Sequence, residues 1–251
     1  MPDRFCLERF RYSAKEENPR LRSTAETRLL PRTPTTIPSP PKSKRRRREP
    51  PNHLPPLPDA LAPDLDVLLV GLNPGISTSI SGHAYAHPSN LFWKLLHTSG
   101  MTPRACSPAE DALLPGLFGL GLTNLVARPS RSGADLGRAE MDAGVSVLEG
   151  KVRRWRPRAV CLVGKGIWDS VARAKMLPRR DFRYGWQDDD ACRLGAVEGE
   201  WEGAPVFVAS STSGLAASLS PAEKLRIWTE LGDWVKARRA ERERRHCLES
   251  G

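Results

Sequence analysis

The sequence predicts an α/β protein in which a parallel sheet is covered by helices on both faces. From residue 65 onward, short apolar runs alternate with segments of helical periodicity, and repeated strand–helix units imply a parallel sheet between helix layers. The apolar runs are continuous rather than alternating, which is typical of strands buried on both faces. This part of the chain is also long enough to form one well-buried core.

The first two predicted strands enclose one predicted helix. LDVLLVGL, at residues 65–72, is the first strand, and NLFWKLLHTSG, at 90–100, is the helix. Ser89 or Asn90 starts this helix and a glycine stops it. GLGLTNLVAR, at 119–128, is the second strand.

The alternation continues through the second half of the chain. A helix is predicted at 139–155, where apolar residues recur at intervals of three and four. A strand at 158–164, a helix at 165–176 and a strand at 204–211 follow. The last helix begins at Ser220, which forms a capping box with the glutamate three residues later.

The two ends of the chain differ in composition from this alternating region. Residues 1–60 hold 12 of the 23 prolines and few large apolar side chains. We expect them to be a disordered tail, because they cannot bury enough surface to offset the entropy of ordering. Residues 61–238 form the predicted folded domain, and residues 239–251 form a basic C-terminal tail.

The surplus of positive charge lies toward the two ends of the chain, in residues 1–60 and 236–251. The formal net charge is +10, yet residues 61–235 hold 19 basic and 19 acidic side chains. The run KSKRRRR, at residues 42–48, fits a nuclear import receptor, and we expect a nuclear protein. Two other interpretations stay open: the run binds a polyanion through counterion release, or it is only a solvated charge run.

Several kinds of site are not indicated. The five cysteines are odd in number and include no CxxC pair, which fits a reducing compartment rather than a disulfide framework or a zinc site. His83 and His87 lie four apart without a nearby Cys or carboxylate, so no metal is expected. There is no GxxxxGK[ST], GxGxxG or GxSxG motif. We expect neither a membrane span nor a secretion signal, because no apolar run is long enough.

The loops after the strands are the candidate site, because ligands bind beyond the carboxyl ends of parallel strands. These loops cover residues 73–89, 127–138, 164–166 and 210–220.

Asn73 stands at the end of the first strand, with Gly71, Pro74 and Gly75 around it. The glycines allow close backbone approach and positive φ, and Pro74 restricts the backbone of Asn73, so its amide is held stiffly. An amide can orient a water molecule but is no strong base. Taken alone, Asn-Pro-Gly favours an ordinary turn. Tyr85, in the same loop, either stacks on a planar ring or anchors the loop.

Unusual side chains follow the other strands as well. Asn124 is polar within an apolar run, so it faces either solvent or a site that needs an amide. Donor groups around Ser213 could hold a phosphate. Leu215 either packs on the next helix or wedges into a base stack. Lys165 places a cation at a helix start, where the helix dipole disfavours positive charge. An anionic ligand bound there would explain it.

Five motifs occur together in order: GLNPG, GHAYAHPSNLFWKLLHTSG, GLTNLVARPS, RPRAVCLVGK and SSTSGLAASLS. In order and spacing they resemble the mismatch-specific uracil/thymine DNA glycosylases of the uracil-DNA glycosylase superfamily, across residues 64–238. The resemblance implies a three-layer α/β/α sandwich with a short central parallel sheet. It also implies hydrolysis of the N-glycosidic bond of uracil or thymine mispaired with guanine in double-stranded DNA, without a cofactor or metal.

The resemblance also assigns roles by position. Asn73 would orient the attacking water, Tyr85 would stack on the flipped base, and Asn124 would hydrogen-bond the pyrimidine edge. Ser130 would lie beside the base or its 5-substituent. The substrate-binding residues implied are Gly71, Pro74, Gly75, Tyr85, Asn124 and Ser130. The DNA-binding residues implied are Lys165, Ser213, Gly214 and Leu215, with Gly214 and Leu215 as the wedge that fills the space left by the base.

The chemistry of these residues fits that reaction. A base inside a duplex must be flipped out, which costs less for a mispaired base. Because Asn73 is no base, the reaction would be largely dissociative and slow, and better leaving groups should react faster. No motif places a Schiff-base lysine, so we expect a monofunctional enzyme that leaves an abasic site and starts base excision repair. We expect it to act as a monomer.

Some residues depart from the family pattern. Ser211 and Thr212 replace Asn-Pro or Met-Pro, and Ala217 replaces a common Arg, which weakens the expected grip on DNA. Ala84 replaces the His of thymine-active members, which favours uracil over thymine. Two other classes stay open: a DNA-binding protein of this fold that has lost catalysis, and a hydrolase of small nucleosides or nucleotides.

Overall fold

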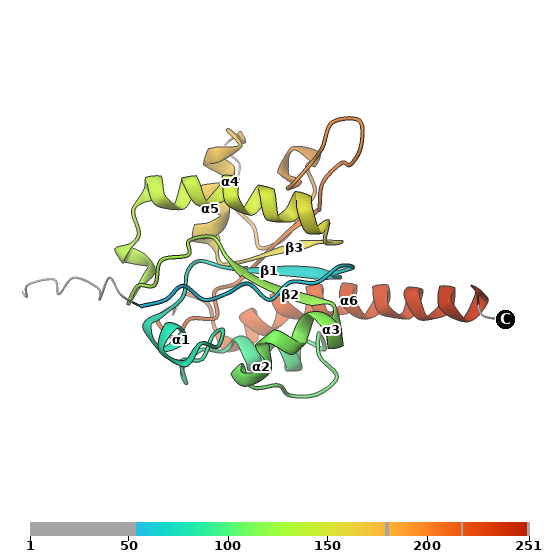
Figure 1. Ribbon diagram of the computed structural model, residues 1–251, viewed down its shortest axis with the longest axis horizontal. Coiled ribbons are helices and arrows are strands. Elements are labelled where there is room, and N and C mark those ends of the chain that lie inside the picture. The colour runs from blue at the N-terminus through green and yellow to red at the C-terminus, as the bar shows by residue number, and fades with distance from the viewer. Residues whose placement is uncertain (1–53, 179–180, 217, 250–251) are drawn as a thin grey trace, which may run out of the picture. The chain divides into compact units, whose positions relative to one another are not determined.

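A five-stranded sheet runs through the middle of the described part of the chain (Figure 1). The computed structural model describes residues 54–178, 181–216 and 218–249. The sheet has the strand order β2-β1-β3-β5-β4. The strands are β1 (Val67–Gly71), β2 (Leu120–Asn124), β3 (Val160–Val163), β4 (Gly185–Gln187) and β5 (Val206–Ala209).

Four of these strands are parallel and coincide with the four predicted ones, so the predicted α/β class is confirmed. β4 pairs antiparallel with β5 and was not predicted. It has only three residues, too few for a periodic pattern to appear.

The helices form a layer on each face of the sheet. They are α1 (Ile76–Ser81), α2 (Phe92–Thr98), α3 (Leu114–Phe118), α4 (Arg138–Trp155), α5 (Lys165–Ala174) and α6 (Pro221–Glu249). Three 3-10 helices are η1 (Pro108–Leu113), η2 (Gly133–Asp135) and η3 (Asp190–Cys192). In Figure 1, α4 and α5 cover one face, and α2, α3 and α6 lie on the other. The predicted three-layer sandwich is therefore confirmed.

Two side-chain signals lie at or next to the predicted helix starts, although the N-cap of α2 is Leu91 and not Ser89 or Asn90. Asn90 accepts a hydrogen bond from the Phe92 N–H at 3.0 Å, ahead of α2. Ser220 and Glu223 form the capping box of α6, with distances of 2.8 and 3.2 Å. By contrast, α1 was not predicted. It lies inside the segment 73–89, which the sequence analysis treated as a loop.

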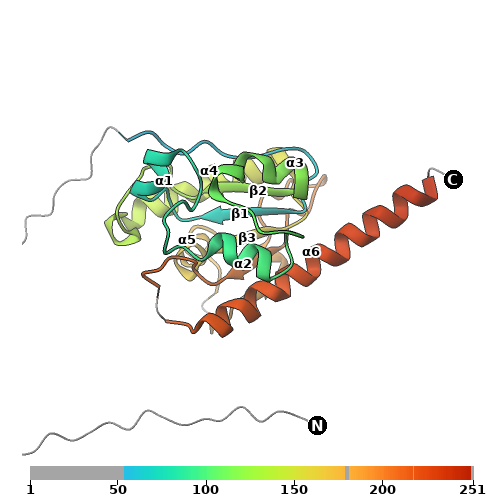
Figure 2. The ribbon, with the colours of Figure 1, turned by 90° about the horizontal axis from the view of Figure 1, so that it is seen from below.

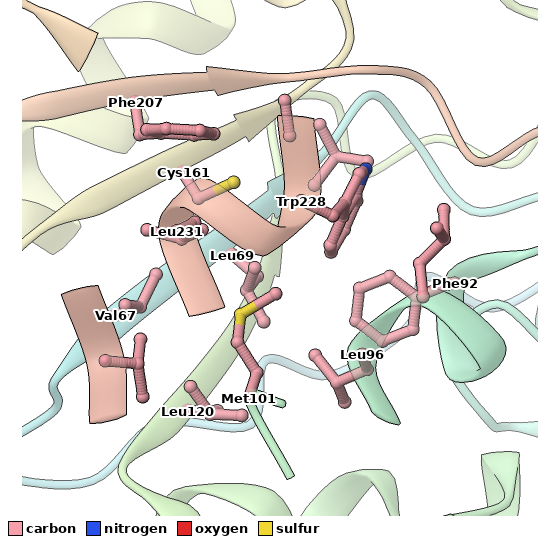
Figure 3. Packing of buried hydrophobic residues seen from close by; sticks show 14 of the residues in the cluster. Val67, Leu69, Phe92, Leu96, Met101, Leu120, Cys161, Phe207, Trp228 and Leu231 are labelled. Carbon is pink, nitrogen blue, oxygen red and sulfur yellow. The ribbon is translucent and has the colours of Figure 1, made fainter. Parts of the chain in front are cut away.

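Strand β1 lies between two hydrophobic cores. Val67 and Leu69 face the core formed with α2 and α6, whereas Leu68 and Val70 face the core formed with α4 and α5. Figure 3 shows Val67 and Leu69 in the first core, with Trp228 from α6 packed among them. Because both faces are buried, β1 is a continuous apolar run and not an alternating one.

Helix α6 continues well beyond the boundary placed at residue 238 (Figure 2). Asp66, at the start of β1, is buried and lies 3.7 Å from Arg239 and 3.4 Å from Arg242 of this extension. Arg239 also donates to the carbonyl oxygens of Met101 and Phe118. Burial raises the pKa of Asp66, and the surrounding arginines oppose that change. The first part of the segment set aside as a C-terminal tail is thus helical and packed on the domain.

Residues 54–60, named the N-terminal strap here, also belong to the fold. Ala60 and Leu122 exchange two backbone hydrogen bonds of 2.9 and 2.8 Å on the outer edge of β2. Asp59 accepts from the Thr123 hydroxyl at 2.6 Å and pairs with Lys151 of α4 at 2.7 Å. The tail predicted for residues 1–60 is therefore corrected at its end: the strap covers an edge strand that would otherwise be open. Residues 1–53, with the basic run, lie outside the described residues.

Candidate active site

A pocket of about 860 Å³ opens at the carboxyl ends of the parallel strands. This is the edge where ligands of such sheets bind. The pocket brings together residues from the loops after β1, β2 and β5. Those to which the resemblance assigned a binding or catalytic role are Asn73, Pro74, Gly75, Tyr85, Asn124, Ser130, Ser213, Gly214 and Leu215.

The amide nitrogen of Asn73 makes three hydrogen bonds. It donates to the carbonyl oxygens of Pro74 (3.2 Å) and Arg128 (3.0 Å) and to the hydroxyl of Ser130 (2.8 Å). Because a carbonyl oxygen can only accept, the atom that faces Pro74 and Arg128 must be the nitrogen. Oδ1 is therefore on the opposite side of the amide, and it forms no hydrogen bond within the described residues. It remains an acceptor for water or a ligand.

The loop after β2 is fastened to the loop after β1. The Ser130 N–H donates to the Pro74 carbonyl at 3.1 Å, and Gly75 and Ser130 form a parallel bridge. The buried Ser130 hydroxyl donates in turn to the Ser132 carbonyl at 2.8 Å while it accepts from Asn73. The loop after β2 thus fixes the side chain of Asn73, and the loop after β1 fixes that of Ser130.

Arg128, whose carbonyl holds Asn73, is itself held by Glu140 of α4. Its Nε and Nη2 donate to the two carboxylate oxygens at 2.7 and 2.8 Å. This bidentate pair lowers the pKa of Glu140, chiefly through the hydrogen bonds from Arg128. The long helix α4 therefore supports the loop after β2.

Tyr85 has a left-handed backbone conformation with φ of 53°, which is uncommon for residues other than glycine. Its ring stacks on Phe92 of α2, with centroids 3.8 Å apart and planes 9° apart. One face of the ring is thereby covered, so a ligand can stack only on the other. Burial raises the pKa of the Tyr85 phenol, which therefore stays protonated. One face of the Tyr85 ring thus anchors the loop, and the opposite face is open for a ligand to stack on.

Both backbone polar groups of Ala84, the residue before Tyr85, form hydrogen bonds to side chains. The Ala84 N–H donates to Asp111 at 2.7 Å, and the Ala84 carbonyl accepts from the Trp93 indole at 3.1 Å. Asp111 also lies 3.2 Å from Nδ1 of His83. Asp111 lines the pocket from η1 and was missed in the sequence analysis. Nothing in its sequence surroundings marks it, because the contact spans 27 positions.

The side chains of Asn124 and Tyr85 both lie close to Gly71, at the end of β1. A Cβ at this position would lie 2.6 Å from Oδ1 of Asn124 and 2.8 Å from the Tyr85 hydroxyl. The predicted close approach at Gly71 is therefore confirmed. Neither Gly71 nor Gly75 has the positive φ that glycine also allows: the positive-φ glycines of the described residues lie elsewhere, and Gly75 has φ of −72° as the cap of α1.

Two polar groups beside Gly71 have no hydrogen-bond partner in the described part of the chain. They are the side-chain amide of Asn124, at the end of β2, and the buried hydroxyl of Tyr85. Buried polar groups in proteins are normally paired. Both groups are therefore available to the edge of a bound ring, and Asn124 lines the pocket.

Leu215 lies at the rim of the pocket with 81% of its surface exposed. The preceding Gly214 packs closely on the loop after β1, since a Cβ there would meet Oγ of Ser89 at 2.4 Å. Leu215 does not pack on the next helix, which was one of its two interpretations. Ala217 lies outside the described residues.

Lys165 does not reach the pocket. Its ammonium pairs with Asp169 at 2.8 Å and lies 5.1 Å from the centre of the Phe182 ring. The anion that the sequence analysis invoked to explain this cation is therefore a side chain of the same helix. Strap residues Leu57, Pro58 and Ala60 line the pocket instead, although the sequence analysis had placed them in the tail.

Two further kinds of feature are absent from the described residues. No group of three or more His, Cys, Asp or Glu side chains there could hold a metal ion. No helix in that part of the chain has the length and apolarity needed to cross a membrane.

A flat ring with hydrogen-bonding edges fits this site, because Tyr85 offers a stacking face and Asn124 an amide at the ring's edge. The fold and the site thus define an α/β protein whose pocket, at the carboxyl ends of the strands, offers a stacking face and an amide edge suited to a planar heterocycle. The chain belongs to the uracil DNA glycosylase superfamily, whose family model matches residues 58–232.

Two individual proteins illustrate the similarity. A G/U mismatch-specific uracil DNA glycosylase of Schizosaccharomyces pombe is 40% identical over 189 residues, which cover 73% of this chain and 54% of the relative. The chain thus spans about half the length of that relative. A solution NMR structure from Methanosarcina acetivorans, described as a candidate uracil DNA glycosylase, matches with a TM-score of 0.48 and 15% identity, covering 73% of this chain and 98% of the other.

Proposed function

We propose that the protein is a monofunctional uracil-DNA glycosylase directed to mismatches. It would hydrolyse the N-glycosidic bond of uracil paired with guanine in double-stranded DNA and leave an abasic site, the first step of base excision repair. The observation that carries the proposal is the Asn73 amide, anchored through its nitrogen with Oδ1 left open at the strand-end pocket. The family membership and the printed activity of the S. pombe relative support the choice of substrate.

The substrate base has to leave the duplex before it can enter this pocket. Flipping costs a few kcal/mol and costs less for a mispaired base, which favours G·U over A·U without any contact to the guanine. Leu215, exposed at the rim, is the side chain placed to fill the space that the base leaves. An apolar wedge of this kind keeps the stack open.

The flipped uracil would be recognised by its face and by its edge. The free face of Tyr85 would stack on the ring, and the unpaired amide of Asn124 offers a donor and an acceptor to the pyrimidine edge. The Tyr85 hydroxyl is a second donor. Ala84, next to Tyr85, stands where the resemblance implies a His in thymine-active members, so we propose uracil rather than thymine as the preferred base.

Asn73 would act by orientation rather than by proton abstraction. Oδ1 accepts a hydrogen bond from the attacking water and directs its oxygen to the sugar carbon that bears the base. An amide cannot take the proton, so bond cleavage has to run ahead of water attack, through an oxocarbenium-like sugar and a pyrimidine anion. Forgoing general base catalysis, typically worth about 10²–10⁴-fold, makes the enzyme slow and sensitive to the leaving group.

The test is base release from a G·U duplex oligonucleotide, read as strand scission after alkali. The wild-type protein should cleave, and Asn73→Ala should lose turnover while it still binds the duplex. Gln187→Ala is the matched control, because it removes an amide from the edge strand β4 and should cleave like the wild type. Cleavage by Asn73→Ala at the wild-type rate would rule out the mechanism.

The same assay separates the two other classes. Duplex binding without base release by the wild type would identify a DNA-binding protein of this fold that has lost catalysis. Base release from a free nucleoside but not from the duplex would identify a nucleoside hydrolase. Comparing G·U with G·T duplexes measures the preference for uracil.

We further propose that the run at residues 42–48 is read by a nuclear import receptor and that the protein works in the nucleus as a monomer. The support is the density of Lys and Arg in that run. A fluorescent fusion should accumulate in nuclei, and replacing the run by Gln and Ser should abolish this. Unchanged localisation would contradict the import role. Light scattering in solution measures the oligomeric state.

A further inference from the structure

Lys224 is a buried cation beside the loop that presents Leu215. Only 5% of its surface is exposed, and its ammonium donates to the Ala216 carbonyl at 2.8 Å. No carboxylate among the described residues forms an ion pair with it. The neighbouring Glu223 is not its counter-ion, because that carboxylate accepts from the Ser220 N–H at 2.8 Å in the capping box.

This position is unfavourable for a lysine. A buried ammonium without a counter-ion is costly, and α6 begins only a few residues earlier, where the helix dipole also disfavours a cation. The adjacent buried positions of α6, Ile227 and Trp228, are apolar. A lysine here therefore points to a specific contact, and the contact it makes is the one to Ala216.

Ala216 closes the turn that carries the wedge. Its N–H donates to the Ser213 carbonyl at 3.0 Å, and the Leu215 N–H lies 3.3 Å from the Ser213 hydroxyl. The side chain of Leu215 stands at the tip of this turn. Residues 213–216 are named the wedge turn here.

The wedge turn is held from two sides. Upstream, the Thr212 carbonyl accepts from the Leu91 N–H at 2.9 Å, and Gly214 abuts Ser89. Downstream, the chain leaves toward residue 217, and Lys224 supplies the contact that fixes Ala216. Leu215 has no side-chain support of its own at 81% exposure. Its direction is thus set by the backbone of the turn.

We propose that Lys224 is a positioning residue that holds the wedge turn through Ala216, so that Leu215 meets the DNA already ordered. The inference rests on the proposed function, and it adds a residue that acts through Leu215 and not on the substrate. The physical reason is entropic. A turn fixed during folding loses its freedom before binding, so less of the binding energy is spent on ordering it when the base stack is opened.

The test removes the ammonium while keeping a side chain of similar length. Lys224→Met should lower kcat/KM on a G·U duplex roughly tenfold, the effect expected for one charge-assisted hydrogen bond. Arg226→Met is the matched control: it removes the same charge from an exposed position two residues along α6, and it should leave kcat/KM unchanged. Lys224→Gln, which keeps an N–H donor, should recover part of the loss and also serves if the Met variant does not fold.

A double-mutant cycle separates positioning from general destabilisation. If Lys224 acts through the wedge, Lys224→Met should have no further effect in a Leu215→Ala protein. Additive losses in the double variant would overturn the inference. So would a tenfold loss in Arg226→Met.

A second readout does not depend on base release. The fluorescence of 2-aminopurine placed beside the mismatch reports opening of the base stack. The rise on binding should be smaller for Lys224→Met than for the wild type and equal for Arg226→Met. If the wild type releases no base but opens the stack, and Lys224→Met opens it less, the proposed function is defeated and this inference is still supported. An equal rise in all three proteins would overturn the inference alone.

Discussion

The amide nitrogen of Asn73 lies 2.8 Å from the hydroxyl oxygen of Ser130, which is 57 positions later in the chain. This hydrogen bond joins the loop after β1 to the loop after β2. Together with the Arg128 carbonyl, it determines which end of the Asn73 amide is bound and which end is open. The orientation of the Asn73 amide thus depends on a hydrogen bond between two loops.

Replacing Ser130 by Ala should lower kcat/KM on a G·U duplex about fivefold. One neutral hydrogen bond is worth about 1 kcal/mol, and Asn73 would keep its two carbonyl partners. Single-turnover rates measure the effect. Ser132→Ala, which removes only a local cap of η2, should change little. A loss in Ser130→Ala as complete as that in Asn73→Ala would show that Ser130 has a role beyond orientation.

Gly71→Ala and Gly75→Ala form a matched pair. A Cβ on Gly71 would collide with Asn124 and Tyr85, and nothing lies within 4 Å of a Cβ on Gly75. Overpacking should lower the free energy of unfolding of Gly71→Ala by about 1–3 kcal/mol and displace both recognition groups, so uracil release should fall strongly. Gly75→Ala should resemble the wild type in thermal unfolding. Equal behaviour of the two variants would contradict the close packing at Gly71.

The Arg128–Glu140 pair should give stability that depends on pH. The pKa of Glu140 is lowered from its ordinary value of 4.5 by the hydrogen bonds from Arg128. The folded protein therefore favours the carboxylate. The stabilisation is fully present above pH 4.5 and is lost as the pH falls through the lower folded pKa. Urea unfolding should show wild type more stable than Glu140→Gln at neutral pH, with a difference that shrinks in acid.

Glu198→Gln is the control for this pH series, because Glu198 is exposed and makes no ion pair within the described residues. Its stability should follow the wild type at every pH. A difference between wild type and Glu140→Gln that grows in acid would have the wrong sign and would refute the role of the pair.

Two truncations should behave differently at the N-terminal strap. Removing residues 1–53 keeps the strap and should leave thermal unfolding and uracil release at low salt unchanged. Removing residues 1–60 deletes two backbone hydrogen bonds to Leu122 and the Asp59 contacts. The free energy of unfolding should fall by about 2 kcal/mol, and base release should fall because one wall of the pocket is gone. Identical activity of the two proteins would show that the strap is dispensable.

The basic run gives a further comparison in the same experiment. The slope of binding against salt concentration reports the number of phosphate contacts. A shallower slope after removal of residues 1–53 would indicate that the run binds DNA directly. An unchanged slope would exclude phosphate contacts and favour the import role alone.

The sequence by itself determined the four parallel strands and the longer helices. Their signals are local, because a strand buried on both faces is a continuous apolar run and a helix facing one core repeats every three or four residues. The strand ends then located the site, and Asn73, Tyr85, Asn124 and Leu215 all line the pocket. The residues next to each of these four in the sequence were enough to mark them as candidate site residues.

Only the tertiary structure decided which way these side chains face and what holds them. The open end of the Asn73 amide, the support of Ala84 by Asp111, the strap on β2 and the contact from Lys224 to the wedge turn join residues from 8 to 64 positions apart. The same limit explains the misplaced tail boundaries. Lys165 is a different case, because its counter-ion Asp169 lies four positions along the same helix and the pair is a local one. Hydrogen bonds are directional and short-ranged, so partners are chosen by where the folded chain brings donors and acceptors, and not by a repeating pattern in the sequence.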